Sequence, residues 1–244
     1  MWKVECGLVT DKDINVFSGY HDDELGITRD NIINQEKIMA EKFSSYENKT
    51  FAYLAKIKDI ELLNSMNNQY QENKVMGQRQ AWHILLQYAI MDKWGVKVDV
   101  NNIKISPNGK PYMDKYEFSI SHCQGLVCVV ISEVEVGVDI ECATKPRQWQ
   151  RLSRRVLTLE EQDISKDEKT MTAIWTKKEA VFKLLGERVF NPSKIDISRY
   201  CVDTIDDIFY DDNFYILSVA THKKTANHLI VKTMQLLKEG WSLV

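Results

Sequence analysis

The sequence has no long hydrophobic run, which excludes a transmembrane helix. Its longest uninterrupted apolar stretch covers residues 126–131, whereas a membrane-spanning helix needs about 20 such residues. The first residues, MWKVECGLVTDKD, predict a strand followed by polar residues. They have neither the basic start nor the longer apolar core of a secretory signal peptide. We therefore expect a cytoplasmic protein without a membrane partner.

The sequence also lacks cysteine pairs and a strong charge of either sign. Its 5 cysteines include no C-x-x-C pair, so neither a disulfide framework nor a zinc site is indicated. The net charge of -3 is too small to imply a general attraction to nucleic acid. No low-complexity segment, tandem repeat or Pro/Gly/Ser linker divides the 244 residues. The chain is long enough for one large domain or two small lobes in compact contact.

Hydrophobic periodicity favours an α+β fold. It predicts long helices over 73–95 and 167–187 and a short basic helix over 147–156, followed by a capping box from Thr158 to Glu161. Alternating patterns predict strands at 116–123, 126–132, 136–141, 193–200, 213–221 and 228–234, with a Pro-Asn-Gly turn between two short strands within 102–113. Segment 42–68 has no clear periodicity. Segregated helices and strands with hairpin-like connections favour α+β over a doubly wound parallel sheet.

Two acidic residues stand out in the strand predicted at 136–141. Val136, Val138 and Ile140 alternate with Gly137, Asp139 and Glu141, so both acids lie on the same face of that strand. In the second long helix, Glu179 and Lys183 lie one turn apart, at the edge of an apolar stripe formed by Met171, Ile174, Trp175, Phe182 and Leu185. Each signal alone also fits a simpler interpretation, namely two solvated carboxylates and a surface ion pair.

Taken together, the acids indicate a metal site. Like charges on one face repel, and a divalent cation between them removes that repulsion. Three carboxylates from a strand and a helix form the hard-oxygen set that suits Mg²⁺ with phosphate oxygens. Such a site favours phosphoryl or related transfer.

Candidate phosphate-binding residues lie in the preceding segments. Ser121 and His122 end a strand, Lys110 follows the Pro-Asn-Gly turn, and Lys74 and Arg79 lie near a helix start, where phosphates are favoured. Each also has a structural interpretation: a hydrogen-bonded turn histidine, a solvated lysine or an arginine lying along its own helix. A basic helical face is also predicted, and it has two equally compatible interpretations: it can steer an acidic partner, or it can simply be solvated. Its residues are Arg147, Arg151, Arg154 and Arg155.

The motifs occur in an order that resembles a known family. GKPY (109–112), SISH (119–122), GVDIE (137–141) and WTKKEAVFK (175–183) resemble the 4′-phosphopantetheinyl transferases, specifically their large, monomeric Sfp-type branch. The resemblance implies two similar α/β lobes related by pseudo-twofold symmetry, which correspond to residues 1–136 and 137–244. Coenzyme A and Mg²⁺ or Mn²⁺ would lie in the cleft between the lobes.

The resemblance also implies roles for individual residues. Asp139, Glu141 and Glu179 would hold magnesium, and Lys183 would stabilise or protonate the departing 3′,5′-ADP. The coenzyme A ligands would be Lys74, Arg79, Lys110, Ser121 and His122. The nucleophile would be a serine of an apo acyl or peptidyl carrier protein, with Glu179 as the candidate base.

The sequence departs from the family pattern at two places. Relatives often follow the final lysine with a basic glycine-rich turn, whereas Glu187 and Arg188 follow Gly186 here. Cys123 follows SISH, where small polar residues are frequent. Two other functions remain open from the residues: a metal-dependent phosphodiesterase or nuclease that uses the same carboxylates, and a carrier-binding module without catalysis.

Overall fold

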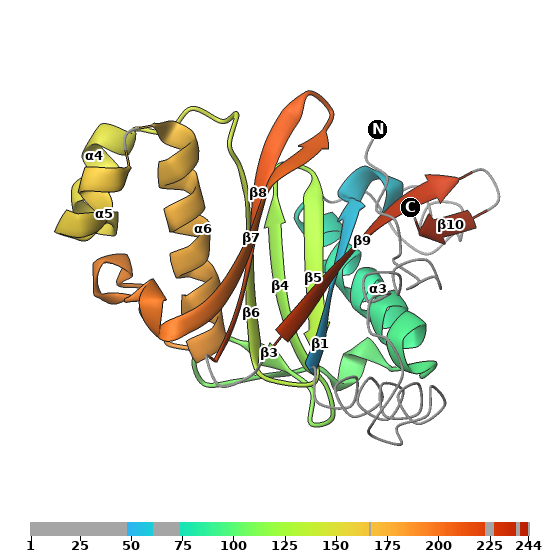
Figure 1. Cartoon of the computed structure of the whole chain (residues 1–244). Coiled ribbons are helices and arrows are strands. Elements are labelled where there is room, and N and C mark those ends of the chain that lie inside the picture. The colour runs from blue at the N-terminus through green and yellow to red at the C-terminus, as the bar shows by residue number, and fades with distance from the viewer. Residues whose placement is uncertain (1–47, 61–73, 166, 223–226, 238–239, 244) are drawn as a thin grey trace, which may run out of the picture. The chain divides into compact units, whose positions relative to one another are not determined.

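Two β-sheets pack against each other between two long helices (Figure 1). The computed structural model describes residues 48–60, 74–165, 167–222, 227–237 and 240–243. Within these residues, the larger sheet has the strand order β10-β9-β1-β5-β4. Its strands are β1 (Asn48–Lys56), β4 (Glu117–Cys123), β5 (Leu126–Ser132), β9 (Asn227–Leu237) and β10 (Gly240–Leu243).

The smaller sheet has the order β6-β8-β7 and is antiparallel throughout. It consists of β6 (Val136–Cys142), β7 (Tyr200–Tyr210) and β8 (Asn213–His222), and a separate hairpin pairs β2 (Lys104–Ile105) with β3 (Pro111–Tyr112). The described helices are α3 (Lys74–Trp94), α4 (Trp149–Val156), α5 (Leu159–Ile164) and α6 (Glu168–Leu185), with 3-10 turns at Val100–Asn102, Pro192–Lys194 and Ile197–Arg199.

Strand β5 shows how the layers are built. Val127, Val129 and Ile131 pack with α3 in one core. The alternate residues Leu126, Cys128 and Val130 pack against β6 and β8 in a second core. Both faces of β5 are therefore buried, which explains its continuous apolar sequence. The described layers follow the order α3, larger sheet, smaller sheet, α6, and the predicted α+β class is confirmed.

The two predicted long helices are confirmed, and their ends show the expected chemistry. Helix α3 ends before Gly95, which has a positive φ of 66°. Helix α6 begins after Asp167, whose side chain accepts from the Thr170 N–H, and ends at Gly186 in a left-handed conformation. The capping box of α5 is also present, with Thr158 and Glu161 bonded reciprocally.

Several local predictions were wrong. In place of the strand predicted over 193–200, residues 192–194 and 197–199 form 3-10 turns, and the strand begins only at Tyr200. The unassigned segment 42–68 contains β1, a central strand of the larger sheet. Leu185 is partly exposed, whereas Val181 and Leu184 are buried, because α6 contacts β6 and β8 through a face shifted from the predicted stripe.

The predicted N-terminal strand lies outside the described residues. No described helix is long and apolar enough to cross a membrane.

Candidate functional site

The two sheets are joined along β4 and β6 by side chains that accept backbone N–H groups. Ser119 Oγ accepts from Val138 N at 3.1 Å, Ser121 Oγ from Ile140 N at 3.2 Å, and Cys123 Sγ from Cys142 N at 3.2 Å. The alternation of a strand places these three side chains on one face of β4. We call this set of contacts the side-chain ladder. It holds β6 in a register that places Asp139 beside Ser121.

Asp139 lies at the centre of the site. Its Oδ1 accepts from Ser121 Oγ at 2.9 Å and from Lys183 Nζ at 2.8 Å. Its Oδ2 is buried and has no hydrogen-bond partner among the described residues. The Asp139 side chain is only 4% exposed, and an unpaired carboxylate oxygen at such a position is costly. The free oxygen therefore leaves a place for a cation or for a donor, which can come from a ligand or from Glu179 in its protonated form.

Glu179 faces Asp139 from α6. Burial raises the pKa of Glu179 to about 7, with a further contribution from the Asp139 carboxylate and partial compensation by Lys183. A protonated Glu179 can donate a hydrogen bond to Asp139, which also favours the neutral form. Glu179 and the adjacent Asp139 carboxylate are a suitable pair of oxygen ligands for a divalent cation, because a cation between them would offset the repulsion that raises the pKa of Glu179.

Glu141, the third predicted metal ligand, is bonded by its own chain. Its Oε1 accepts from Trp175 Nε1 at 3.1 Å. Its Oε2 is paired with Arg147 and accepts from Cys123 Sγ at 3.4 Å. Burial and the adjacent Glu141 raise the pKa of the Cys123 thiol to about 12, so this thiol stays protonated at neutral pH. Both oxygens of Glu141 therefore have hydrogen-bond partners in the protein, whereas Oδ2 of Asp139 has none among the described residues.

Two of the three predicted carboxylate ligands are placed to bind a metal ion. Asp139 and Glu179 lie next to each other, and Oδ2 of Asp139 has no hydrogen-bond partner among the described residues. No group of three or more His, Cys, Asp or Glu side chains is arranged to hold a metal ion in the part of the chain that the structure describes. Mg²⁺ usually keeps several waters and takes only one or two carboxylates alongside substrate phosphates, so two converging carboxylates are compatible with it.

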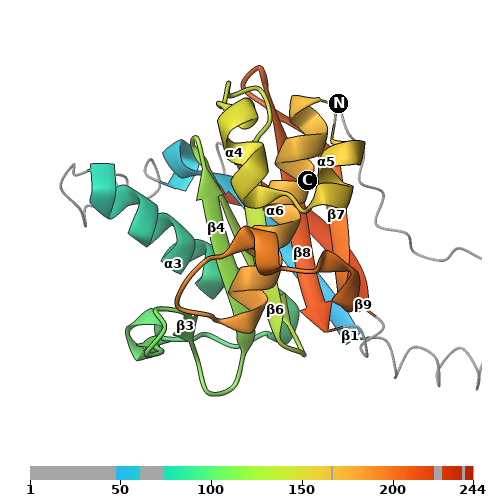
Figure 2. The same cartoon turned by 90° about the vertical axis from the view of Figure 1, so that its left-hand side faces the viewer.

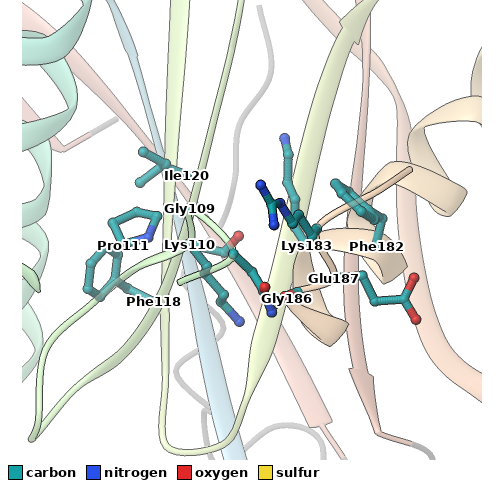
Figure 3. Close-up of a pocket in the computed structure, with 12 residues that line it drawn as sticks. Gly109, Lys110, Pro111, Phe118, Ile120, Phe182, Lys183, Gly186 and Glu187 are labelled. Atoms are coloured by element: carbon teal, nitrogen blue, oxygen red, sulfur yellow. Dashed lines mark hydrogen bonds between the residues drawn. The ribbon is translucent and has the colours of Figure 1, made fainter. Parts of the chain in front are cut away.

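A cavity of about 380 Å³ lies beside this cluster, between the Pro-Asn-Gly hairpin and the end of α6 (Figure 3). Lys110, Lys183 and Arg188 supply cations to its lining, and Glu187 supplies a carboxylate. Its other lining residues are Asn108, Gly109, Pro111, Phe118, Ser119, Ile120, Phe182 and Gly186. The cavity thus combines apolar walls with positive charge, as a ligand with both an apolar ring and phosphates requires.

Contacts across the cavity fix the hairpin to α6. Asn108 Nδ2 donates to Gly186 O at 2.9 Å, and Lys110 Nζ donates to Leu184 O at 3.3 Å. Burial lowers the pKa of Lys110, although Glu117 and Glu135 oppose that effect. Figure 3 shows Lys110 extending from the hairpin toward the helix that carries Lys183.

The other predicted coenzyme A residues occupy different positions. Ser121 is buried and bonded within the protein. His122 is exposed at the end of β4, with the same strand parity as Phe118 and Ile120, which pack toward α3. Arg79 is exposed on α3. Among the described residues, neither Arg79 nor His122 lines the cavity, and the side chain of Lys74 lies outside the description.

Two basic residues have roles that the sequence patterns did not indicate. Arg147 precedes α4, so it does not share a helical face with Arg151, Arg154 and Arg155, as was predicted; instead it pairs with Glu141. Lys178 is fully buried. Its ammonium contacts Glu161 at 2.6 Å and donates to the carbonyls of Val156 at 3.0 Å and Pro192 at 2.9 Å.

Lys178 therefore connects α6 to the last residue of α4, the first turn of α5 and the turn at Pro192–Lys194. Figure 2 shows α4 and α5 beside α6. Glu161 is part of both this contact and the capping box of α5. No role was predicted for Lys178, although its spacing of four residues from Ile174 and three from Val181 places it on the same helical face as these two buried residues.

The fold and site define an α+β protein with paired acids and a cationic cavity at the junction of two sheets. Residues 135–229 match the family model of the 4′-phosphopantetheinyl transferase superfamily. This segment is thus similar to a superfamily of transferases, and it contains Asp139, Glu141, Glu179 and Lys183. None of the curated proteins matches the chain significantly.

Proposed function

We propose that this protein transfers the 4′-phosphopantetheine group of coenzyme A to a serine of an apo acyl or peptidyl carrier protein. The observation that carries the proposal is the buried Asp139, whose free Oδ2 lies in a cluster with Glu179 and Lys183. The similarity of residues 135–229 to the transferase superfamily supports it. The order of motifs favours the Sfp-type branch, with pseudo-symmetric lobes at 1–136 and 137–244.

Each charged group of the cluster has a separate role in this reaction. The serine oxygen forms a bond to the β-phosphorus of coenzyme A, the bond from that phosphorus to the bridging oxygen breaks, and 3′,5′-ADP leaves. Asp139 and Glu179 would hold Mg²⁺ or Mn²⁺, and the bound ion would supply Lewis-acid stabilisation of phosphate charge. Glu179 is the candidate acceptor of the serine proton. Lys183 is partly exposed, so its ammonium can stabilise the departing phosphate.

The cavity would bind the nucleotide end of coenzyme A. Pro111, Phe118 and Phe182 provide apolar surface, while Lys110 and Arg188 provide positive charge for phosphate. Ser121 would act indirectly, since its hydroxyl donates to Asp139 and accepts from Lys183. Lys74, Arg79 and His122 remain proposed phosphate contacts, and neither Arg79 nor His122 lines this cavity.

Exposed arginines on α4 support an acidic protein partner. Arg151, Arg154 and Arg155 are exposed on α4, which packs beside α6 (Figure 2). A cluster of like charge speeds the association of an oppositely charged partner, most strongly at low salt. We propose that these residues steer the carrier protein toward the site, and that the enzyme acts as a cytoplasmic monomer.

Intact mass spectrometry of the carrier tests this proposal. The protein is incubated with coenzyme A, MgCl₂ and a purified apo carrier protein, and a carrier mass increased by one phosphopantetheine supports the transfer. Hydrolysis of coenzyme A with an unchanged carrier, or hydrolysis of a nucleic acid added to a parallel sample, would instead show a phosphodiesterase or nuclease. A stable complex of unmodified carrier and protein, without either reaction, would show a binding module.

A further inference from the structure

Glu141 and Asp139 differ sharply in the partners that the protein gives them. Both project from the same face of β6. Asp139 keeps one buried oxygen without a hydrogen-bond partner. Both oxygens of Glu141 are occupied, one by Trp175 and the other by Arg147 and Cys123. Oε2 already accepts from two donors, so a metal ion could reach Glu141 without displacing a donor only at the second acceptor site of Oε1, beside the Trp175 indole.

The Arg147 side of this contact is held in place by aromatic rings. The guanidinium carbon lies 5.6 Å from the ring centre of Trp149 and 5.9 Å from that of Trp175. The side chains of Arg147 and Glu141 are only 19% and 15% exposed. Cation–π contacts and partial burial make such an arginine difficult to move, because its release would leave a carboxylate or a guanidinium unpaired in a poorly solvated place.

We propose that Arg147 is the resident countercharge of Glu141, so that Asp139 and Glu179 alone provide the carboxylate ligands of the divalent cation. Glu141 is then a positioning residue: it fixes the Trp175 indole and anchors the start of α4 through Arg147. The inference rests on the proposed function, since it concerns the cation that the transfer requires. It replaces the predicted set of three carboxylate ligands with two.

Charge-matched variants separate a ligand from a positioning residue. The affinity for Mn²⁺ is measured by electron paramagnetic resonance of the free ion, and circular dichroism monitors folding. Asp139→Asn and Glu179→Gln should each lose at least about tenfold in affinity, since loss of a ligand costs no less than loss of an outer-shell partner. Glu141→Gln should also bind weakly, because it leaves the positive charge of Arg147 unpaired near the ion.

The double variant Glu141→Gln/Arg147→Gln gives the decisive comparison. It removes the pair without changing the net charge, so its Mn²⁺ affinity should return to within about threefold of the unaltered protein. When Arg147→Gln is added to Asp139→Asn instead, it should restore much less Mn²⁺ affinity than it restores to Glu141→Gln. The control Lys169→Gln/Asp206→Asn removes an exposed pair and should leave the affinity unchanged. The inference would be overturned if Arg147→Gln raised the Mn²⁺ affinity of Glu141→Gln and of Asp139→Asn by the same factor. It would also be overturned if the double variant bound Mn²⁺ as weakly as Asp139→Asn does.

A crystal structure of the unaltered protein with Mn²⁺ gives a second test that does not depend on the folding of variants. The inference expects the anomalous signal beside Asp139 and Glu179, with Glu141 still paired with Arg147. A Glu141 oxygen within about 2.3 Å of the ion, a typical ligand distance, would overturn it while leaving the proposed transfer intact. A complete lack of Mn²⁺ binding by the unaltered protein would overturn both.

Discussion

Gly137 on β6 lies directly against Ala180 on α6. A Cβ atom added at residue 137 would be 2.0 Å from the Ala180 carbonyl oxygen and 2.4 Å from the Leu184 nitrogen. Both of these atoms belong to the backbone of α6, which cannot move aside as a flexible side chain can. The absence of a side chain at Gly137 is therefore what lets α6 approach β6 and bring Glu179 and Lys183 beside Asp139.

Replacing Gly137 tests this close approach. We expect Gly137→Ala to lower the free energy of unfolding by about 3 kcal/mol, the upper end of the usual range for overpacking, because the clash involves main-chain atoms. Urea unfolding followed by circular dichroism measures the effect. Unchanged stability together with full transferase activity would show that α6 does not need to lie this close to β6.

Lys178 provides a test of how the helices around the site are held together. Lys178→Met should lower the free energy of unfolding by about 3–5 kcal/mol, because it breaks a buried ion pair with Glu161 and removes the ammonium hydrogen bond to the Val156 carbonyl. The Pro192 carbonyl also loses the ammonium but keeps the Ile195 N–H as a donor. The control Lys177→Met, at the neighbouring half-buried position, should change stability by no more than about 0.5 kcal/mol. Equal effects of the two variants in thermal unfolding would argue against the anchoring role.

The side-chain ladder makes a prediction for Cys123. Cys123→Ala leaves the Cys142 N–H without its acceptor, which should cost about 1–3 kcal/mol. Cys123→Ser keeps a group that can both accept from Cys142 and donate to Glu141, so it should recover most of that stability. His122→Ala, at the adjacent exposed position, is the control. The role of the ladder is refuted if the alanine and serine variants at position 123 melt at the same temperature.

Short periodic patterns predicted much of this fold and the core of the site. Alternation over Val136–Glu141 correctly placed Asp139 and Glu141 on one face of a strand, and helical spacing placed Glu179 and Lys183 on one helix. The start of α5 followed from its capping box, which depends on residues only three positions apart.

The partners of individual charged groups were not predictable in the same way. The contacts of Lys178 join groups 14, 17 and 22 residues away in sequence, and only the folded chain brings these groups together. Local periodicity likewise included Arg147 in a helix that begins two residues later, because no pattern reports its pairing with Glu141. Strand β1 was missed because its place in the larger sheet depends on β5 and β9, which are distant in sequence.

Arg188 tests the proposed cavity. Arg188→Gln should raise the KM for coenzyme A by about tenfold or more and change kcat less, because a charge-assisted contact to phosphate is lost away from the bond that breaks. Steady-state kinetics with coenzyme A as the varied substrate measures both constants. Arg199→Gln changes an exposed arginine and should leave them unaltered. An unchanged KM in the Arg188 variant would show that this turn does not bind the cofactor.

The most direct test of the account is the stoichiometry of the transfer itself. Apo carrier protein, coenzyme A and MgCl₂ are incubated with the unaltered protein or with Asp139→Asn, and each sample is analysed for intact carrier mass and for released 3′,5′-ADP. We predict one 3′,5′-ADP for every phosphopantetheine attached to a carrier serine with the unaltered protein. Asp139→Asn should remain folded and form neither product. An unmodified carrier with the unaltered protein, or equal rates with Asp139→Asn, would contradict the account.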